Sequence, residues 1–86
     1  ILQKKRVKIE YHANYSQELT KRETEPIGLF YMMESWYLLA YCLLRKDYRT
    51  FKVNRIKEII PLEKDFEQIH LDLKTLIKKL YTDDEE

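Results

Sequence analysis

The chain has few of the residues that build linkers, disulfides and metal sites. Its 86 residues include one glycine, two prolines, one cysteine and two histidines. So little glycine and proline argues against linkers and low-complexity segments, and Cys42 alone cannot form an internal disulfide. Two separate histidines and one cysteine do not make a zinc site, so we expect no metal and no cofactor. A single cysteine without a disulfide partner is typical of a reducing compartment, so we expect the protein in the cytoplasm.

Long apolar runs are also missing. No stretch is long enough to cross a bilayer, and no signal peptide stands before the first strand-like run. We therefore expect no membrane partner. The chain opens at Ile1 without an initiator methionine, which favours a piece cut from a longer protein. Its length allows one small domain with a single core.

Charge is nearly balanced in total but unevenly spread. Residues 1–57 carry twelve basic and six acidic side chains, a net charge of +6. Residues 58–86 carry four lysines and nine acidic side chains, a net charge of −5. A basic face attracts nucleic acid or small anions, although a solvated surface is the simpler reading of any single lysine.

Alternating apolar and polar residues predict strands over most of the chain. The expected strands are 5–11, 18–25, 27–33, 36–44 and 48–53, with 58–61 extending the sheet and a polar turn at 12–17. Strand 18–25 has charges on both faces and is expected near an edge. Strand 36–44 is apolar on both faces and is expected to be central. Short strands with tight connections predict a mainly β fold, a small barrel or a strongly curved sheet.

The spacing of the apolar residues changes in the last quarter of the chain. Apolar residues recur there at spacings of three and four, the pattern of an amphipathic helix: Phe66, Ile69, Leu73, Leu76, Ile77 and Leu80. We expect the helix near residues 71–81, with its apolar stripe on the sheet, and a frayed acidic end at 82–86. The chain thus divides into a β domain at residues 1–61 and a helix with an acidic tail at residues 62–86.

Several arginines are placed at predicted strand ends, where long side chains reach a surface. Guanidinium offers five fixed donors and stays charged, so it suits phosphate or carboxylate recognition. We predict an anion-binding groove lined by Arg22, Arg45, Arg49 and Arg55, with Tyr11 or Tyr37 at its edge. These arginines could instead form rim salt bridges of little energetic weight, and Tyr37 could instead pack in the core.

Large apolar side chains in the central strand are expected to fill the core. We predict that Trp36, Leu38 and Phe51 are buried, and that Trp36→Ala costs roughly 3–5 kcal/mol. Cys42 is also expected to be buried, without a base beside it.

Candidate catalytic groups are scarce. Glu23 and Glu25 are interpreted as a solvated pair matched by nearby cations, and His70 as structural. No Gly-rich phosphate loop occurs. The sequence therefore predicts a protein that is not an enzyme.

Short motifs follow one another in a fixed order along residues 5–60. They are Ile9-Glu10-Tyr11, the Pro26-containing run 22–29, Trp36-Tyr37-Leu38 with Ala40-Tyr41-Cys42 after it, Arg49-Thr50-Phe51 and Asn54-Arg55-Ile56. In this order they resemble the WYL domains, which are found mostly in bacterial transcription regulators. Residues after Pro61 carry no motif of that family.

The resemblance implies an Sm-like five-stranded barrel behind an N-terminal helix-turn-helix DNA-binding domain, which this chain does not include. It also implies a sensor module that binds a nucleotide, nucleic acid or other small anion and alters DNA binding by the attached domain. Two other hypotheses remain open. One is a direct single-strand nucleic-acid binder that stacks bases on its tyrosines, and the other is a homodimerisation module.

Overall fold

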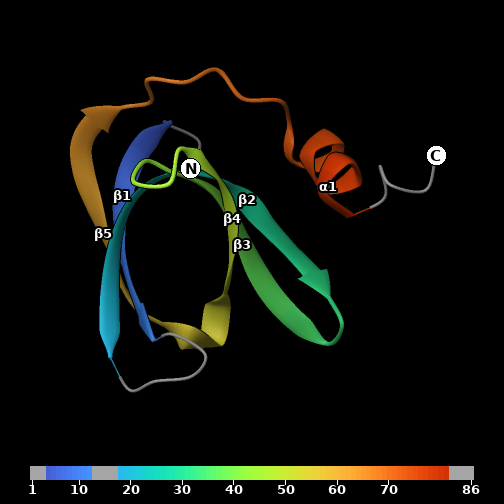
Figure 1. The fold of residues 1–86 in the computed structure, drawn as a ribbon, viewed down its shortest axis with the longest axis horizontal. Helices are drawn as coiled ribbons and strands as arrows, with labels where there is room; N and C mark the ends of the chain where they lie inside the picture. The colour runs from blue at the N-terminus through green and yellow to red at the C-terminus, as the bar shows by residue number, and fades with distance from the viewer. Residues whose placement is uncertain (1–3, 13–17, 82–86) are drawn as a thin grey trace.

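The structure, a computed structural model, describes residues 4–12 and 18–81 as one curled antiparallel sheet and a helix (Figure 1). Residues 13–17 of the turn predicted at 12–17 and the acidic end predicted at 82–86 lie outside these residues, whereas His12 is the last residue of the first strand. The elements are β1 (Lys5–His12), β2 (Leu19–Met32), β3 (Ser35–Cys42), β4 (Asp47–Lys52), the 3-10 helix η1 (Val53–Arg55), β5 (Ile56–Asp65) and α1 (Leu73–Tyr81). Neighbouring strands follow the order β4-β3-β2-β1-β5. The mainly β fold with five strands and a C-terminal helix is confirmed.

Strand β2 bends and joins the two halves of the sheet. Its first half pairs with β1 and its second half with β3, and the register shifts between Pro26 and Gly28. Such a bulge bends a strand and increases its twist. β4 and β5 are the two ends of the hydrogen-bonded order, so the sheet curls like a barrel without closing by hydrogen bonds.

One prediction about this segment is wrong. Residues 18–25 and 27–33 were expected as separate strands, but the bulge lets them run on as one. The charged first half was expected near an edge. Its residues 19–22 pair with β1 on one side, and pairing with β3 on the other side begins only at Thr24, which agrees with that prediction over these residues.

A two-residue turn joins β2 to β3. Met33 and Glu34 have φ angles of 51° and 64°, and the register runs from Met32 to Ser35 across the turn. Two consecutive positive φ angles match the twist of a tight hairpin. The strands expected at 27–33 and 36–44 left residues 34 and 35 for the connection. The structure places the turn one residue earlier and makes Ser35 the first residue of β3.

The two faces of the curled sheet carry two apolar clusters. The inner face holds buried Ile9, Leu38, Ala40 and Phe51. The outer face holds buried Phe30 and Leu39, which pack with Leu76 of α1. The predicted burial of Leu38, Phe51 and Cys42 is confirmed.

The predicted burial of Trp36 is wrong, because its side chain is 54% exposed. Trp36 lies on the same side of β3 as Leu38, two residues closer to the hairpin turn and opposite Tyr31. Its ring meets the edge of the Tyr31 ring, but more than half of the residue stays open to solvent.

The C-terminal arm, residues 66–72, passes from β5 over the curled sheet to α1 (Figure 1). α1 begins at Leu73, two residues later than expected, and buries Leu76 against the outer face. A Cβ on Gly28 would lie 3.0 Å from Leu73 Cδ2, so glycine lets the helix approach β2 closely. Within the described residues, no helix is long and apolar enough to cross a membrane.

Candidate functional site

Two of the four candidate arginines share the inner face. Arg22 of β2 lies opposite Ile9, and Arg49 of β4 lies opposite Ala40. Directly opposed residues of antiparallel strands point to the same side of a sheet. Ile9 and Ala40 belong to the inner-face cluster, so both guanidinium side chains start from that face.

Arg22 is incompletely bonded. Its Nη1 donates to the carbonyl oxygen of Lys21 at 3.1 Å, while its Nε is buried and has no hydrogen-bond partner among the described residues. A buried donor left unpaired costs about 1–3 kcal/mol. A ligand that brings an acceptor to this Nε would therefore gain the free energy of a hydrogen bond that the domain alone does not form.

Arg45 and Arg55 lie at opposite ends of β4. Arg45 is exposed in the turn that precedes the strand, and Arg55 is partly buried in η1, which follows it. A strand of this length extends about 20 Å. Arg45, Arg49 and Arg55 thus follow one another along β4 and its two ends, while Arg22 starts from β2. A single ligand shared by all four stays a prediction.

The two candidate tyrosines lie on different faces. Tyr11 packs on the inner-face cluster, with its ring edge-on to Phe51 at a centroid distance of 5.0 Å. Tyr37 belongs to the outer-face cluster and stacks on Phe30 at 5.5 Å. Tyr11 therefore shares a face with Arg22 and Arg49, whereas Tyr37 does not.

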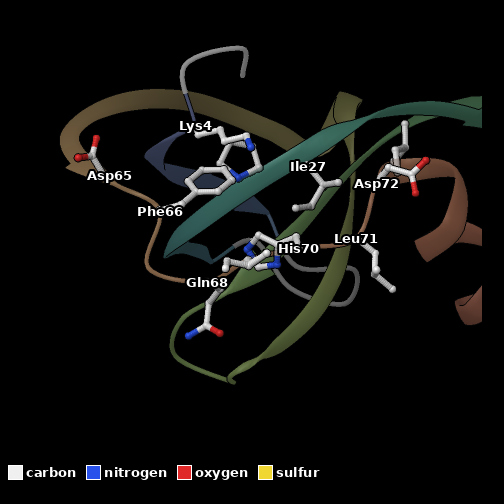
Figure 2. A pocket seen from close by; sticks show the side chains of 11 residues that line it. Lys4, Ile27, Asp65, Phe66, Gln68, His70, Leu71 and Asp72 are labelled. Atoms are coloured by element: carbon white, nitrogen blue, oxygen red, sulfur yellow. The ribbon is translucent and has the colours of Figure 1, made fainter.

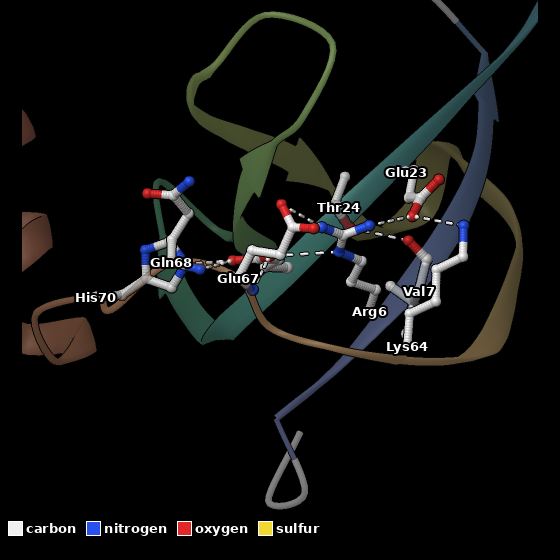
Figure 3. A network of polar contacts seen from close by, with 9 residues as sticks. Arg6, Val7, Glu23, Thr24, Lys64, Glu67, Gln68 and His70 are labelled. Atoms are coloured by element: carbon white, nitrogen blue, oxygen red, sulfur yellow. Dashed lines mark hydrogen bonds and ion pairs between the residues drawn. The ribbon is translucent and has the colours of Figure 1, made fainter.

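A buried carboxylate that the sequence analysis missed holds the C-terminal arm (Figure 3). Glu25 is fully buried, so its interpretation as half of a solvated pair is wrong. It accepts hydrogen bonds from the backbone N–H of Glu67 at 2.7 Å and from His70 Nε2 at 2.7 Å. Longer contacts of 3.4 Å come from the N–H of Gln68 and from Arg6 Nε.

These donors decide the charge state of Glu25. Burial alone would raise the pKa of its carboxyl, but the hydrogen bonds from Glu67, His70, Gln68 and Arg6 outweigh burial and lower the pKa. Glu25 is therefore an anion in the folded protein at neutral pH. A single buried charge on β2 anchors three donors of the arm.

His70 connects this carboxylate to β4. Its side chain is 5% exposed, and its Nδ1 lies 2.7 Å from the hydroxyl of Tyr48. With Nε2–H donating to Glu25, Nδ1 accepts from Tyr48. Burial is the largest of the causes that raise the pKa of the Tyr48 hydroxyl, followed by the nearby Tyr41, Glu25 and Asp47.

Arg6 completes the network from β1. Its Nη1 lies 2.8 Å from Glu23 and its Nη2 lies 3.0 Å from Glu67. The hydrogen bond from Arg6 is the main cause that lowers the pKa of Glu23. Because the guanidinium of Arg6 is paired with these carboxylates, Arg6 stabilises the fold and does not form part of an anion site.

A cavity of about 620 Å³ lies between the arm and β2 (Figure 2). Ile27, Phe66, His70 and Leu71 line it, with Lys4 and Asp65 at its side. Both ring nitrogens of His70 are already bonded, so this histidine offers the cavity no free donor or acceptor. In the described part of the chain, no three His, Cys, Asp or Glu side chains are grouped so that they could hold a metal ion.

Known proteins resemble this chain in sequence and fold. The family model described as WYL domain matches residues 1–61. An uncharacterized HTH-type transcriptional regulator of Bacillus subtilis, YobV, is 43% identical over 65 residues, which are 76% of this chain and 21% of that protein. Proteasome accessory factor B/C (PafBC) of Arthrobacter aurescens has the same fold, with a TM-score of 0.73 and 21% identity over 84% of this chain and 12% of that chain. The chain spans about a fifth of the curated relative, and it belongs to the WYL domain family.

Proposed function

We propose that this WYL domain is the ligand-sensing module of a bacterial transcription regulator and performs no catalysis. The ligand is an anion, a nucleotide or a nucleic-acid phosphate. The name of the Bacillus relative supports a partner helix-turn-helix domain elsewhere in the parent protein, because this chain matches only 21% of that relative. Such a regulator works where the DNA is, in the cytoplasm.

The observation that carries the proposal is the unpaired guanidinium of Arg22. Its buried Nε lacks a partner in the described structure, and Arg49 starts from the same face. Guanidinium binds phosphate through two parallel charge-assisted hydrogen bonds. Tyr11, on the same face, has a ring on which a base could stack and a hydroxyl that can donate or accept a hydrogen bond.

The absence of catalysis is supported by how the reactive side chains are used. Glu25, His70 and Tyr48 form a bonded chain that holds the arm, and Cys42 is buried in the sheet. A general base needs a bonding position left free for substrate. In this network the bonding positions are filled by the protein itself.

Binding measured on point variants tests the site. We expect a labelled single-stranded oligothymidine or ATP to bind, and Arg49→Ala to weaken binding about tenfold or more, because one phosphate contact is lost. Lys64→Ala is the control, since Lys64 lies on β5 and pairs with Glu23 at 3.5 Å. Equal losses in the two variants would indicate general charge and end the proposal.

Salt dependence and ligand length refine the same experiment. With a single strand, loss of one phosphate contact should reduce the slope of log affinity against log salt by about 0.7. If the ligand is a strand that follows β4, Arg45→Ala and Arg55→Ala should weaken it too. If it is a mononucleotide, Arg22 and Arg49 should matter more than either.

Operator binding by the parent regulator, measured with and without ligand, distinguishes a sensor from a plain nucleic-acid binder. A sensor changes the operator affinity of the attached DNA-binding domain when its ligand is added, and Arg49→Ala abolishes that change. A domain that binds single strands without altering operator affinity would support direct nucleic-acid binding instead.

A further inference from the structure

Three residues of the outer face stand in one row across the sheet. Glu25 of β2 lies opposite Tyr41 of β3, and Tyr41 lies opposite Tyr48 of β4. His70 of the C-terminal arm lies over this row, with Nε2 2.7 Å from the Glu25 carboxylate and Nδ1 2.7 Å from the Tyr48 hydroxyl. Its ring centroid is 5.3 Å from that of Tyr41. One side chain thus connects β2 and β4, two strands that β3 separates.

We call His70 with these two hydrogen bonds the cross-brace. Both bonds are short and the imidazole ring between them is rigid, so the cross-brace fixes the distance from the Glu25 carboxylate to the Tyr48 hydroxyl. When a curled sheet bends further, groups on its inner, concave face approach one another and groups on its outer face move apart. The cross-brace therefore holds the sheet at one curvature, and a tighter curl breaks it.

The candidate anion-binding residues Arg22 and Arg49 belong to the same two strands but to the opposite face. Arg22 lies three residues before Glu25 on β2, and Arg49 follows Tyr48 on β4. Both side chains start from the inner face. An anion bound between them attracts both guanidinium groups and draws β2 and β4 together on that face. The anion and the cross-brace thus act on one pair of strands from opposite faces.

Arg22 transmits this attraction to its strand. Its Nη1 donates to the carbonyl oxygen of Lys21 at 3.1 Å, and its Nε is buried. The guanidinium is therefore held close to β2 and cannot follow a ligand without moving the backbone beside it. A ligand that spans Arg22 and Arg49 pulls on the sheet itself.

The arm together with α1, residues 66–81, lies outside the curled sheet, and we call it the strap (Figure 1). At one end Glu25 accepts the N–H groups of Glu67 and Gln68 at 2.7 and 3.4 Å. At the other end α1 buries one residue, Leu76, and leaves Tyr81 41% exposed. A segment with so little buried apolar surface opens at a lower free energy than the strands of a sheet. The strap can therefore leave while the strands stay paired.

We propose that the strap and the anion compete through the curvature of the sheet, so that an anion bound on the inner face releases the strap from the outer face. This inference rests on the anion site proposed above and states how its occupancy is signalled. With the strap docked, the cross-brace resists the tighter curl that the ligand requires. With the ligand bound, the tighter curl breaks the cross-brace. Coupling is reciprocal, so release of the strap strengthens ligand binding by the same factor.

Amide hydrogen exchange followed by NMR measures the release directly, because the N–H groups of Glu67 and Gln68 donate to Glu25. Without ligand, we expect these two amides to exchange through openings that leave β1 and β3 protected. A saturating probe, ATP or single-stranded oligothymidine, should speed their exchange about fivefold or more. Amides of β1 and β3 should slow at the same time, since a ligand that binds only the folded protein stabilises it. A probe that slows the strap together with the sheet would overturn the proposal.

Removing one hydroxyl tests the reciprocal effect. Tyr48→Phe cuts one end of the cross-brace and keeps the ring, so it should raise the affinity for the probe about fivefold or more, although it lowers stability. A purely structural role of Tyr48 would weaken binding or leave it unchanged. Tyr41→Phe is the matched control in the same row, because the Tyr41 hydroxyl forms no hydrogen bond with any described residue. Equal affinities in the two variants would overturn the proposal.

Failure of the coupling and failure of the anion site give different results. If neither ATP nor oligothymidine binds the wild type, the anion site is wrong and the coupling falls with it. If a probe binds and Arg49→Ala weakens it, but strap exchange and the affinity of Tyr48→Phe match the ligand-free and wild-type values, the anion site stands and the coupling alone is wrong. We expect Arg49→Ala to abolish the effect of the probe on the strap.

Discussion

Replacing Glu25 with glutamine tests how the arm is held to the sheet. The substitution keeps the size of the side chain but removes its charge and one acceptor. The donors that face it remain: the N–H of Glu67 and His70 Nε2 at 2.7 Å, and Arg6 Nε at 3.4 Å. The short bonds are then no longer charge-assisted, and the guanidinium of Arg6 loses a counter-charge.

The expected cost follows from these contacts. A hydrogen bond to a charged group contributes about 1.5–3 kcal/mol, and breaking a buried charge network costs about 3–5 kcal/mol. Two short bonds to a fully buried carboxylate place Glu25→Gln at about 3–5 kcal/mol. For a small domain that is a large fraction of the free energy of unfolding, about 5–15 kcal/mol.

Urea denaturation at neutral pH measures this loss, with Glu63→Gln on β5 as the control. The pH dependence gives a second test. Because the pKa of Glu25 is lowered by folding, its charge stabilises the fold above the ordinary pKa of glutamate. That contribution is lost as pH falls through the lowered value. The difference between wild type and variant should therefore shrink below about pH 4.3.

The result that would refute this reasoning is a Glu25→Gln variant as stable as the Glu63→Gln control. A difference that grows in acid would also contradict it, because the lowered pKa requires the opposite sign. Amide hydrogen exchange gives an independent measurement. Loss of the anchor should speed exchange in residues 66–81 more than in β1 or β3.

Three further predictions concern single side chains. Tyr48→Phe removes the hydroxyl bonded to His70 Nδ1 and should cost about 1–3 kcal/mol in urea denaturation, because a buried acceptor loses its partner; an unchanged midpoint would contradict the bonded chain. Leu38→Ala should cost about 2–5 kcal/mol and Trp36→Ala clearly less, since Leu38 is 3% and Trp36 54% exposed; the reverse order in melting curves would restore Trp36 to the core. Gly28→Ala should loosen α1 and speed its hydrogen exchange, because the new Cβ meets Leu73 Cδ2 at 3.0 Å. Adding Leu73→Ala to that variant should leave little extra effect of the alanine.

The local sequence was sufficient to find most of the strands and the helix. Side chains alternate along a strand and recur every three to four residues along a helix, because backbone geometry dictates both periods. The same alternation places Leu38, Ala40 and Cys42 on one side of β3, and all three are buried. The WYL motifs are equally local, which is why the family could be named from ordered short motifs.

Burial at the hairpin could not be predicted in this way. Trp36 has the same alternation as Leu38, yet it is exposed, because burial depends on whether another layer covers that point of the sheet. Likewise, Pro26 suggested the start of a new strand, but a bulge absorbs it within β2. Pairing energy across neighbouring strands outweighed the local break.

The network around Glu25 was decided by tertiary structure alone. Glu25, Tyr48 and His70 lie far apart in sequence and in three different elements, and only the curl of the sheet and the path of the arm bring them together. The sequence limits which side chains can carry charge or donate a hydrogen bond. Whether a glutamate is solvated or fully buried depends on distant donors, because a buried charge is stable only where the fold delivers its partners.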